Sequence, residues 1–150
     1  MSGRKRIVKN KKAYYLYSVG DTIETGIVLL GTEVKSCRKG DVSVGDAYAQ
    51  VEDGEVFLVG FHIAPYKEAD QFNHNPLRKR KLLLHKREIA KLKAARDQKG
   101  MTLVPLELYF RNNKVKLSLG LCKGKNVADK RHALRDRTHR DEMKRAVSKY

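Results

Sequence analysis

The spacing of hydrophobic residues in the first part of the chain favours β-strands. An apolar and aromatic run extends from Ala13 to Val28, and we expect it to bend or break near Gly20 and Gly26. The segment before it, residues 1–12, offers only two branched aliphatic side chains for burial. We therefore expect residues 1–12 to be a basic extension that is disordered on its own.

A short helix is predicted after this first strand. Thr32 would act as its N-cap, about one turn would follow from Val34 to Arg38, and Gly40 would end it.

Alternating spacing returns further along and predicts a hairpin. Asp46 to Val51 alternates as a strand, and Asp53-Gly54 is a strong turn signal. Val56 to Ile63 reads as the returning strand and is apolar enough to be central. Residues 66–77 then form a polar loop of the kind in which binding residues often lie.

The clearest helical spacing lies between Lys79 and Lys99. His85, Ile89 and Leu92 fall at helical intervals, and Gly100 would stop the helix.

A second hairpin is predicted near the end of the chain, with residues 102–110 and 114–121 pairing across Asn112-Asn113. Five or six short antiparallel strands with few helices favour a closed barrel, because closure removes exposed strand edges. The predicted fold is therefore mainly β with helices: a small OB-like antiparallel β-barrel over residues 13–125. It would carry an inserted long helix and a basic tail over residues 126–150, disordered or helical.

Charge is concentrated in blocks along the chain. The net charge is +16, and residues 1–12 carry +6, residues 78–99 carry +8 and residues 121–150 carry +6. The segment 13–77 carries −6. Any one basic block is often only a solvated face, but three in a chain of 150 residues indicate a polyanionic partner, nucleic acid before membrane.

The last thirty residues have too few large apolar side chains on one side to bury against a core. Acids at i to i+4 spacing, such as Asp136–Arg140 and Asp141–Arg145, favour a helix that forms on docking rather than alone. We interpret this tail as a segment that binds an external surface.

The cysteines and the start of the chain indicate where the protein acts. Cys37 and Cys122 have no paired motif, so a reduced chain is expected. No secretory leader and no apolar run of membrane-spanning length is visible. We expect a cytoplasmic protein, and because nothing indicates oligomerisation, a monomer.

Catalytic motifs are not found. The five histidines and two cysteines show no zinc-ligand spacing, and no glycine-rich phosphate loop of the Walker or Rossmann type occurs. His62 lies inside an apolar strand, where a core imidazole is the more common role. We predict a binding protein with no catalytic residue, no metal and no cofactor.

The block from Leu77 to Ile89 is the best candidate for binding within the globular part. It has six cations within residues 78–87, around an apolar triplet that reads as core. Such cations would contact phosphates and position RNA without reading its sequence. Tyr14, Tyr15 and Tyr17 could stack on unpaired bases, although strand tyrosines more often pack internally.

An ordered set of short motifs closely resembles the small protein B (SmpB) family, the SsrA-binding proteins of bacteria. The resemblance runs from about Asn10 to the end of the chain. The motifs in the first part are Gly31-Thr32-Glu33-Val34-Lys35-Ser36, Asp46-Ala47-Tyr48-Ala49 and His62-Ile63-Ala64-Pro65-Tyr66. The later ones are Arg80-Lys81-Leu82-Leu83-Leu84-His85-Lys86-Arg87-Glu88-Ile89, Gly120-Leu121-Cys122-Lys123-Gly124-Lys125 and Asp129-Lys130-Arg131.

The resemblance implies an OB-like barrel that binds the tRNA-like domain of transfer-messenger RNA and enters stalled ribosomes for trans-translation. The RNA face that it implies comprises Asn10, Lys11, Lys12, Glu33, Lys35, Ser36, Leu84, His85, Lys86, Arg87, Lys123, Gly124 and Lys125. The tail would occupy the empty messenger channel of the ribosome as a helix. Its ribosome-engaging residues would be Asp129, Lys130, Arg131, Arg135, Arg137, Arg140, Glu142, Met143 and Arg145.

Two other interpretations remain open from the sequence. A generic ribosome-associated OB-fold protein could thread the tail into ribosomal RNA. Alternatively, the tail could be an amphipathic membrane anchor, although Leu134, Met143 and Val147 do not form a broad apolar face.

Overall fold

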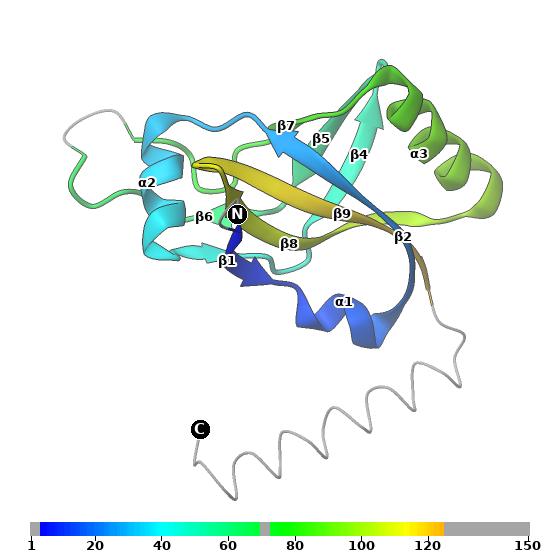
Figure 1. Ribbon diagram of the computed structural model, residues 1–150, viewed down its shortest axis with the longest axis horizontal. Coiled ribbons are helices and arrows are strands. Elements are labelled where there is room, and N and C mark those ends of the chain that lie inside the picture. The colour runs from blue at the N-terminus through cyan, green and yellow to red at the C-terminus, as the bar shows by residue number, and fades with distance from the viewer. Residues whose placement is uncertain (1–3, 70–72, 125–150) are drawn as a thin grey trace, which may run out of the picture.

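The computed structural model describes residues 4–69 and 73–124, which form strands and three helices (Figure 1). The elements are β1 (Arg4–Lys9), α1 (Lys11–Leu16), β2 (Tyr17–Ile27), α2 (Gly31–Lys39), β3 (Val42–Ser43), β4 (Tyr48–Glu52), β5 (Glu55–Val59), β6 (His62–Ile63), β7 (Arg80–Leu83), α3 (Lys86–Lys99), β8 (Thr102–Arg111) and β9 (Lys114–Gly124). Within these ranges, no helix is both long and apolar enough to cross a bilayer.

A single antiparallel sheet forms most of the structure. Its seven strands run in the order β1-β8-β9-β2-β7-β5-β4, and β3 pairs with β6 in a small second sheet. The large sheet curls, so that β4 comes close to β8. The two outer strands, β1 and β4, are not hydrogen-bonded to each other in the described structure. The prediction of a mainly β antiparallel fold is confirmed, but the prediction of a closed barrel is wrong.

The edge strand β1 helps to explain why the sheet stays open. Four of its six residues are Arg or Lys. Cations along an outer strand oppose pairing with a further strand, because pairing would bring charges together and remove them from water.

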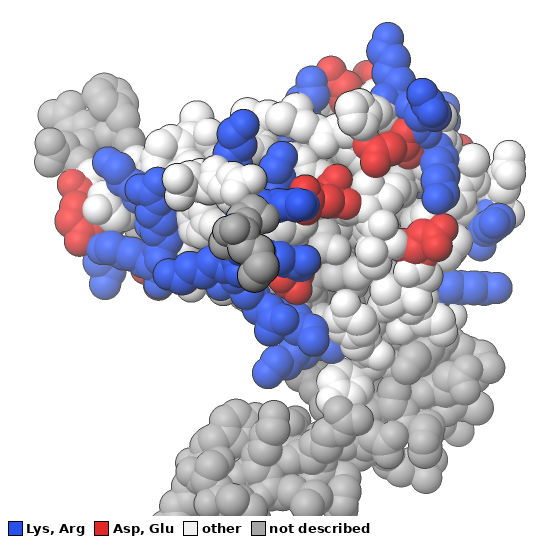
Figure 2. All heavy atoms as spheres, viewed as in Figure 1, with Lys and Arg blue, Asp and Glu red and all other residues white. Residues whose placement is uncertain are grey.

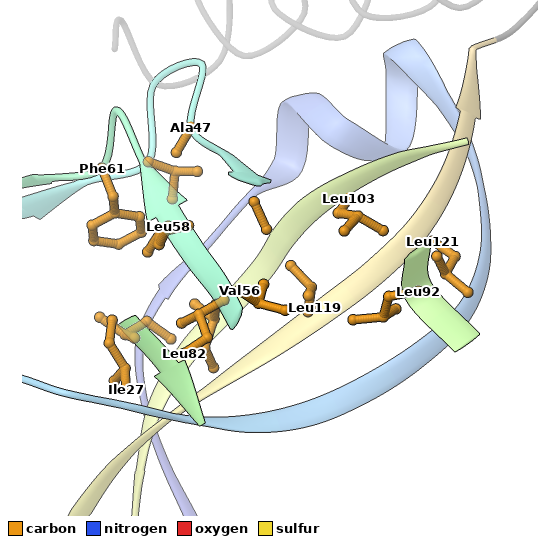
Figure 3. Close-up of a cluster of buried hydrophobic side chains, with 14 of the residues drawn as sticks. Ile27, Ala47, Val56, Leu58, Phe61, Leu82, Leu92, Leu103, Leu119 and Leu121 are labelled. Atoms are coloured by element: carbon orange, nitrogen blue, oxygen red, sulfur yellow. The ribbon is translucent and has the colours of Figure 1, made fainter. Parts of the chain in front are cut away.

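The main core lies on one face of the curled sheet, and side chains of α3 contribute to it (Figure 3). Leu92 of α3 is fully buried in the same cluster as Leu103, Leu119 and Leu121. Burial of one such side chain stabilises the fold by about 2 kcal/mol. The opposite face of β8 and β9 is covered by α1, whose Ala13 packs in a second cluster. The sheet therefore holds the two helices on different faces.

The N-terminal segment differs from the prediction of disorder, because residues 4–9 form β1 on β8. Ile7 and Val8 pack against the core. The Arg4 guanidinium lies 3.9 Å from the centre of the Tyr109 ring and donates to Glu107 at 2.7 Å. Backbone pairing with β8, burial of the two aliphatic side chains and this ion pair together hold the segment in place.

Two helix boundaries also differ from the prediction. The predicted strand from Ala13 begins only at Tyr17, because α1 precedes it. The helix α2 is longer than one turn and its N-cap is Leu30, not Thr32, although Gly40 ends it in the left-handed conformation as predicted.

The helix predicted over Lys79–Lys99 is wrong in its first part. Arg80 and Leu82 are buried while Lys81 and Leu83 are exposed, which is the alternation of strand β7. The helix α3 begins only at Lys86.

Both predicted hairpins are confirmed. The turn residues Asp53, Asn112 and Asn113 have positive φ angles, and the flanking strands pair in register. The strand predicted from Val56 to Ile63 is divided, because Gly60 adopts φ 77° and the chain then enters the small sheet as β6.

Candidate RNA-binding surface

The described residues of the expected RNA face lie in three places on the molecule. One group is on α1 and at the end of β9, a second is on α2, and a third is at the junction of β7 and α3 (Figure 1). Of this set, Lys125 lies outside the described residues. The tail residues also lie outside them: Asp129, Lys130, Arg131, Arg135, Arg137, Arg140, Glu142, Met143 and Arg145.

In the first group, Asn10 has an internal role. It is buried, and its side-chain oxygen accepts a hydrogen bond from the Ala13 backbone N–H at 3.2 Å, which caps α1. Its side-chain nitrogen donates to the Pro105 carbonyl at 2.8 Å. Asn10 therefore fixes α1 on the sheet, and its direct contact with RNA stays a prediction.

Lys11 and Lys12 stand exposed on the helix that Asn10 holds. The Lys12 ammonium is 2.8 Å from the Asp46 carboxylate, in a pair that is exposed on both sides and therefore weak. Strand pairing places Lys123 opposite Ser18, so the end of β9 lies beside the start of β2 directly after α1. The structure thus brings cations from residues 11–12 and 123 to the same end of the sheet.

A hollow of about 170 Å³ lies between α1 and the segment that leads into β4. Its lining includes Lys12, Leu16, Tyr17, Asp46 and Tyr48. The Tyr48 side chain is 44% exposed. An exposed tyrosine beside lysines can stack on an unpaired base while the lysines contact the neighbouring phosphates.

Tyr48 was not among the residues selected from the sequence. The alternation of the strand that contains it, with Ala49 buried, could have indicated an outward-facing aromatic side chain.

The second group centres on Glu33 of α2, which is completely buried. Its carboxylate accepts hydrogen bonds from Arg80 Nε at 2.6 Å, from Arg78 Nη2 at 2.7 Å and from the Leu30 backbone N–H at 2.8 Å. Burial alone would raise the pKa of Glu33, but these hydrogen bonds and the Arg80 charge outweigh it and hold the pKa below its ordinary value. Glu33 thus stays ionised and joins α2 to β7.

The buried partner Arg80 extends this network to the loop before β7. Its Nη1 donates to the Phe61 carbonyl at 2.7 Å and its Nη2 to the Pro76 carbonyl at 3.1 Å. Burial lowers the pKa of Arg80, and the Glu33 carboxylate opposes that effect. Sequence reasoning assigned Arg80 to a basic surface, whereas the structure places its charge inside the protein.

Two further contacts attach α2 to the loop that follows β6. His74 Nε2 lies 2.8 Å from the Ile63 carbonyl and His74 Nδ1 lies 2.8 Å from Thr32 Oγ1. Because a carbonyl only accepts, Nε2 carries the proton, and in the neutral ring Nδ1 accepts from Thr32. Ser36 donates to the Ala64 carbonyl at 2.6 Å.

The residues of α2 therefore differ in whether they can reach an RNA at the surface. Glu33 and Ser36 have their hydrogen bonds within the protein, and their contact with RNA stays a prediction. Lys35 is exposed and its ammonium lies 5.4 Å from the centre of the Tyr66 ring, so this cation remains available at the surface.

The third group lies at the start of α3, where two exposed cations are found. Lys86 and Arg87 are exposed and begin α3, and no ion pair involves either of them in the described part of the chain. His85 is the N-cap, and its backbone N–H donates to Glu88 at 3.0 Å. The half-buried Leu84 lines a hollow of about 380 Å³ with His85 and Lys116, and the carboxylates of Glu24 and Glu88 line it too. An anion is therefore favoured at the exposed start of α3, beside Lys86 and Arg87, rather than inside this hollow.

Both cysteines lie inside the described part of the protein. Cys37 and Cys122 are both free and buried, and burial raises the pKa of their thiols to about 12 and about 11. The described ranges contain no cluster of three metal-ligating side chains.

Comparisons with known proteins agree with one another. A family model described as SmpB protein matches residues 7–149. An SsrA-binding protein of Acetivibrio thermocellus is 55% identical over 144 residues, which are 95% of this chain and 94% of the relative. An SsrA-binding protein of Acidothermus cellulolyticus is 52% identical over 148 residues, 99% of this chain and 93% of the relative.

A solved structure gives the same result in three dimensions. Its description is "tmRNA-SmpB: a journey to the center of the bacterial ribosome", and one of its chains matches with a TM-score of 0.70 at 45% identity. The match covers 85% of this chain and 94% of that one.

Proposed function

The chain belongs to the SmpB family, and from this premise we propose that it binds the tRNA-like domain of transfer-messenger RNA (SsrA RNA) and delivers it to stalled ribosomes for trans-translation. It acts as a binding protein rather than as an enzyme, in the bacterial cytoplasm where ribosomes are. The observation that carries the proposal is the identity of about half of all residues to SsrA-binding proteins over nearly the full length of both chains.

The surface at α1 and the end of β9 is the part of the structure best suited to bind folded RNA. Lys11, Lys12 and Lys123 supply exposed charge for phosphates, and Tyr48 supplies an exposed ring for a base. Asn10 holds α1 in place from inside the protein. A rigid frame under exposed cations lowers the entropy cost of binding.

The Glu33 network supports a positioning role for α2 in this function. The buried ion pair with Arg80 and the contact of Ser36 with Ala64 fix the helix, so that Lys35 is presented from a rigid support. We propose that Glu33 and Ser36 affect RNA binding through this support.

The proposal also assigns a fold type to the curled sheet and a role to the tail. The approach of β4 to β8 supports an interpretation of the sheet as a partly open OB-like barrel. Residues 126–150 carry excess positive charge, which suits a segment that enters the RNA-lined messenger channel of the ribosome while the globular part holds the transfer-messenger RNA.

The test is a binding measurement at equal salt. The full chain should bind the isolated tRNA-like domain at least about a thousandfold more tightly than bulk tRNA, which is the lower end of the range for specific over non-specific recognition of a nucleic acid. Equal affinity for the two RNAs would contradict the proposal and would favour a generic RNA-binding protein of the ribosome.

A further inference from the structure

The loop that follows β6 lies against α2 and places one aromatic ring beside two lysines of that helix. The Lys35 ammonium is 5.4 Å and the Lys39 ammonium 4.9 Å from the centre of the Tyr66 ring. The two lysines are four residues apart, so they lie on the same face of the helix. Figure 2 shows Lys and Arg side chains gathered over α2, at the left of the view. One tyrosine therefore contacts two neighbouring cations of the expected RNA face.

The two lysines differ in the other groups that they bind. Lys39 donates to both carboxylate oxygens of Glu68, at 2.7 and 2.9 Å. Lys35 is exposed and forms no ion pair within residues 4–69 and 73–124. Glu68 compensates the charge of Lys39 and so reduces the repulsion between the two ammonium groups. The charge of Lys35 is left for an external anion.

The backbone of Tyr66 is fixed by the side chain of Asn73. The Tyr66 N–H donates to Asn73 Oδ1 at 3.2 Å, and Asn73 Nδ2 donates to the Tyr66 carbonyl at 2.9 Å. The next residue, the buried His74, has its Nδ1 2.8 Å from Thr32 Oγ1 in the first turn of α2. These contacts hold the Tyr66 backbone at a defined place beside the helix.

The ring of Tyr66 is not used to fill the core. It is half-buried, and it belongs to neither of the two apolar clusters found in the described part of the chain. The hydrogen bonds of Tyr66 to Asn73 and Ala69 are made by its backbone. The partners that the structure gives to the ring are therefore the two lysines.

A ring beside a lysine restricts a side chain that is otherwise flexible. Lysine carries its charge at the end of a four-carbon stem, and ordering that stem on binding costs free energy. A cation–π contact at an exposed site favours the conformations in contact with the ring by about two- to fivefold. Lys35 is thus partly ordered before an anion arrives, and less entropy is lost when its ammonium contacts a phosphate.

We propose that Tyr66 is a positioning residue for RNA binding, which orders the side chain of Lys35 so that its ammonium contacts an RNA phosphate. Glu68 assists by holding Lys39 away from that contact. The proposal rests on the proposed function, because it takes Lys35 as a residue that contacts the tRNA-like domain. Tyr66 itself acts through Lys35 and not by stacking on a base.

The test is a double-mutant cycle on the full chain, in which affinity for the isolated tRNA-like domain is measured by fluorescence anisotropy. Lys35→Gln removes the charge and should weaken binding about fivefold at about 100 mM salt. Tyr66→Leu removes the ring, keeps every charge and should weaken binding about threefold. When the two changes are combined, the loss should be no greater than that of Lys35→Gln alone, because the ring acts only through the lysine.

Two control variants separate positioning from other roles of the tyrosine. Tyr66→Phe keeps the ring and should bind as the wild type does, because a cation–π contact does not need the hydroxyl. Lys86→Gln removes an exposed cation from the start of α3, on a different side of the molecule from α2 (Figure 1). Tyr66→Leu combined with Lys86→Gln should show both losses in full, because distant sites are independent.

Three results would overturn the proposal. Unchanged affinity in Lys35→Gln or in Tyr66→Leu would show that RNA binding does not use this lysine or does not need the ring. Full additivity of those two changes would show that Tyr66 contacts RNA itself or only supports the fold. An equal loss in Tyr66→Phe and Tyr66→Leu would assign the effect to the hydroxyl.

Failure of the proposed function is recognised separately in the same series of measurements. The preference of the wild type for the tRNA-like domain over bulk tRNA is measured alongside the variants. Loss of that preference would contradict the proposed function, whereas failure of the positioning role would appear only in the variants of Tyr66 and Lys35.

Discussion

The carboxylate of Glu33 and the guanidinium of Arg80 meet at 2.6 Å in a place where neither side chain has any exposed surface. The two residues are 47 positions apart in the sequence, so their contact joins α2 to β7 across the fold. A buried pair of this kind contributes little compared with an apolar pair, but removal of one partner leaves a buried charge uncompensated.

Replacement of Glu33 by Gln should therefore destabilise the protein by about 3–5 kcal/mol, because Arg80 remains buried without a countercharge. Urea unfolding followed by circular dichroism would measure the loss. The matched control is Glu68→Gln, which removes an exposed ion pair with Lys39 and should leave the unfolding free energy nearly unchanged, because water screens such a pair. Equal losses in the two variants would contradict a structural role for the buried pair.

The same pair makes stability depend on pH. The pKa of Glu33 is lower in the folded protein than its ordinary value of 4.5. Its contribution is thus complete above about pH 4.5 and is lost as the pH falls through the lower folded-state pKa. The difference in unfolding free energy between the wild type and Glu33→Gln should shrink steadily between pH 5 and pH 2. A constant difference over that range would mean that folding does not lower the pKa of Glu33.

The sequence predicted the elements whose signals are local. The two hairpins carried turn residues that adopt positive φ, and Gly40 and Gly100 ended helices as expected. Such signals depend only on the residues beside them, and tertiary contacts did not override them.

The errors occurred where distant contacts decided the structure. The helical spacing of His85, Ile89 and Leu92 predicted a helix over the whole of Lys79–Lys99, but Arg80 is drawn inward by Glu33 and the first part of the segment becomes a strand. Likewise, the segment 4–9 looked disordered because its partners Glu107 and Tyr109 lie about a hundred residues away. Neither partnership can be read from local spacing.

In the candidate site, too, local features could be predicted from the sequence and distant contacts could not. Lys11, Lys12 and Lys123, which charge and resemblance assigned to the RNA face, are exposed, and their contact with RNA stays a prediction. The buried state of Glu33 and Asn10 depends on how α1 and α2 dock, so the sequence could suggest their importance but not their mode of action.

Tyr48 should contribute to RNA binding through its ring. Tyr48→Ala should weaken affinity for the tRNA-like domain about tenfold, whereas Tyr48→Phe should retain it, because stacking on a base needs the ring and not the hydroxyl. Fluorescence anisotropy with labelled RNA measures both. Leu77→Ala, which truncates a side chain that is 57% exposed elsewhere, serves as the control and should bind normally. Equal loss in the Phe variant would point to a hydroxyl contact in place of stacking.

Deletion of residues 129–150 should separate the two activities of the chain. The deleted segment has eight cations and four acids, so some general attraction to RNA is lost with it. The cations of α1 and the end of β9 remain, however, and should keep affinity for the tRNA-like domain within about threefold of the full chain. Rescue of stalled ribosomes, measured as tagging of a truncated translation product, should be abolished.

A chain that carries the same 22 residues in scrambled order is the matched control, because it keeps the charge of the tail and changes only the position of each side chain. If the tail engages the messenger channel through specific positions, the scrambled chain should bind the tRNA-like domain normally and still fail in rescue. Rescue by the scrambled chain would show that charge alone suffices. A large loss of RNA affinity on deletion would instead show that the tail itself binds the tRNA-like domain. The globular part alone would then not account for binding.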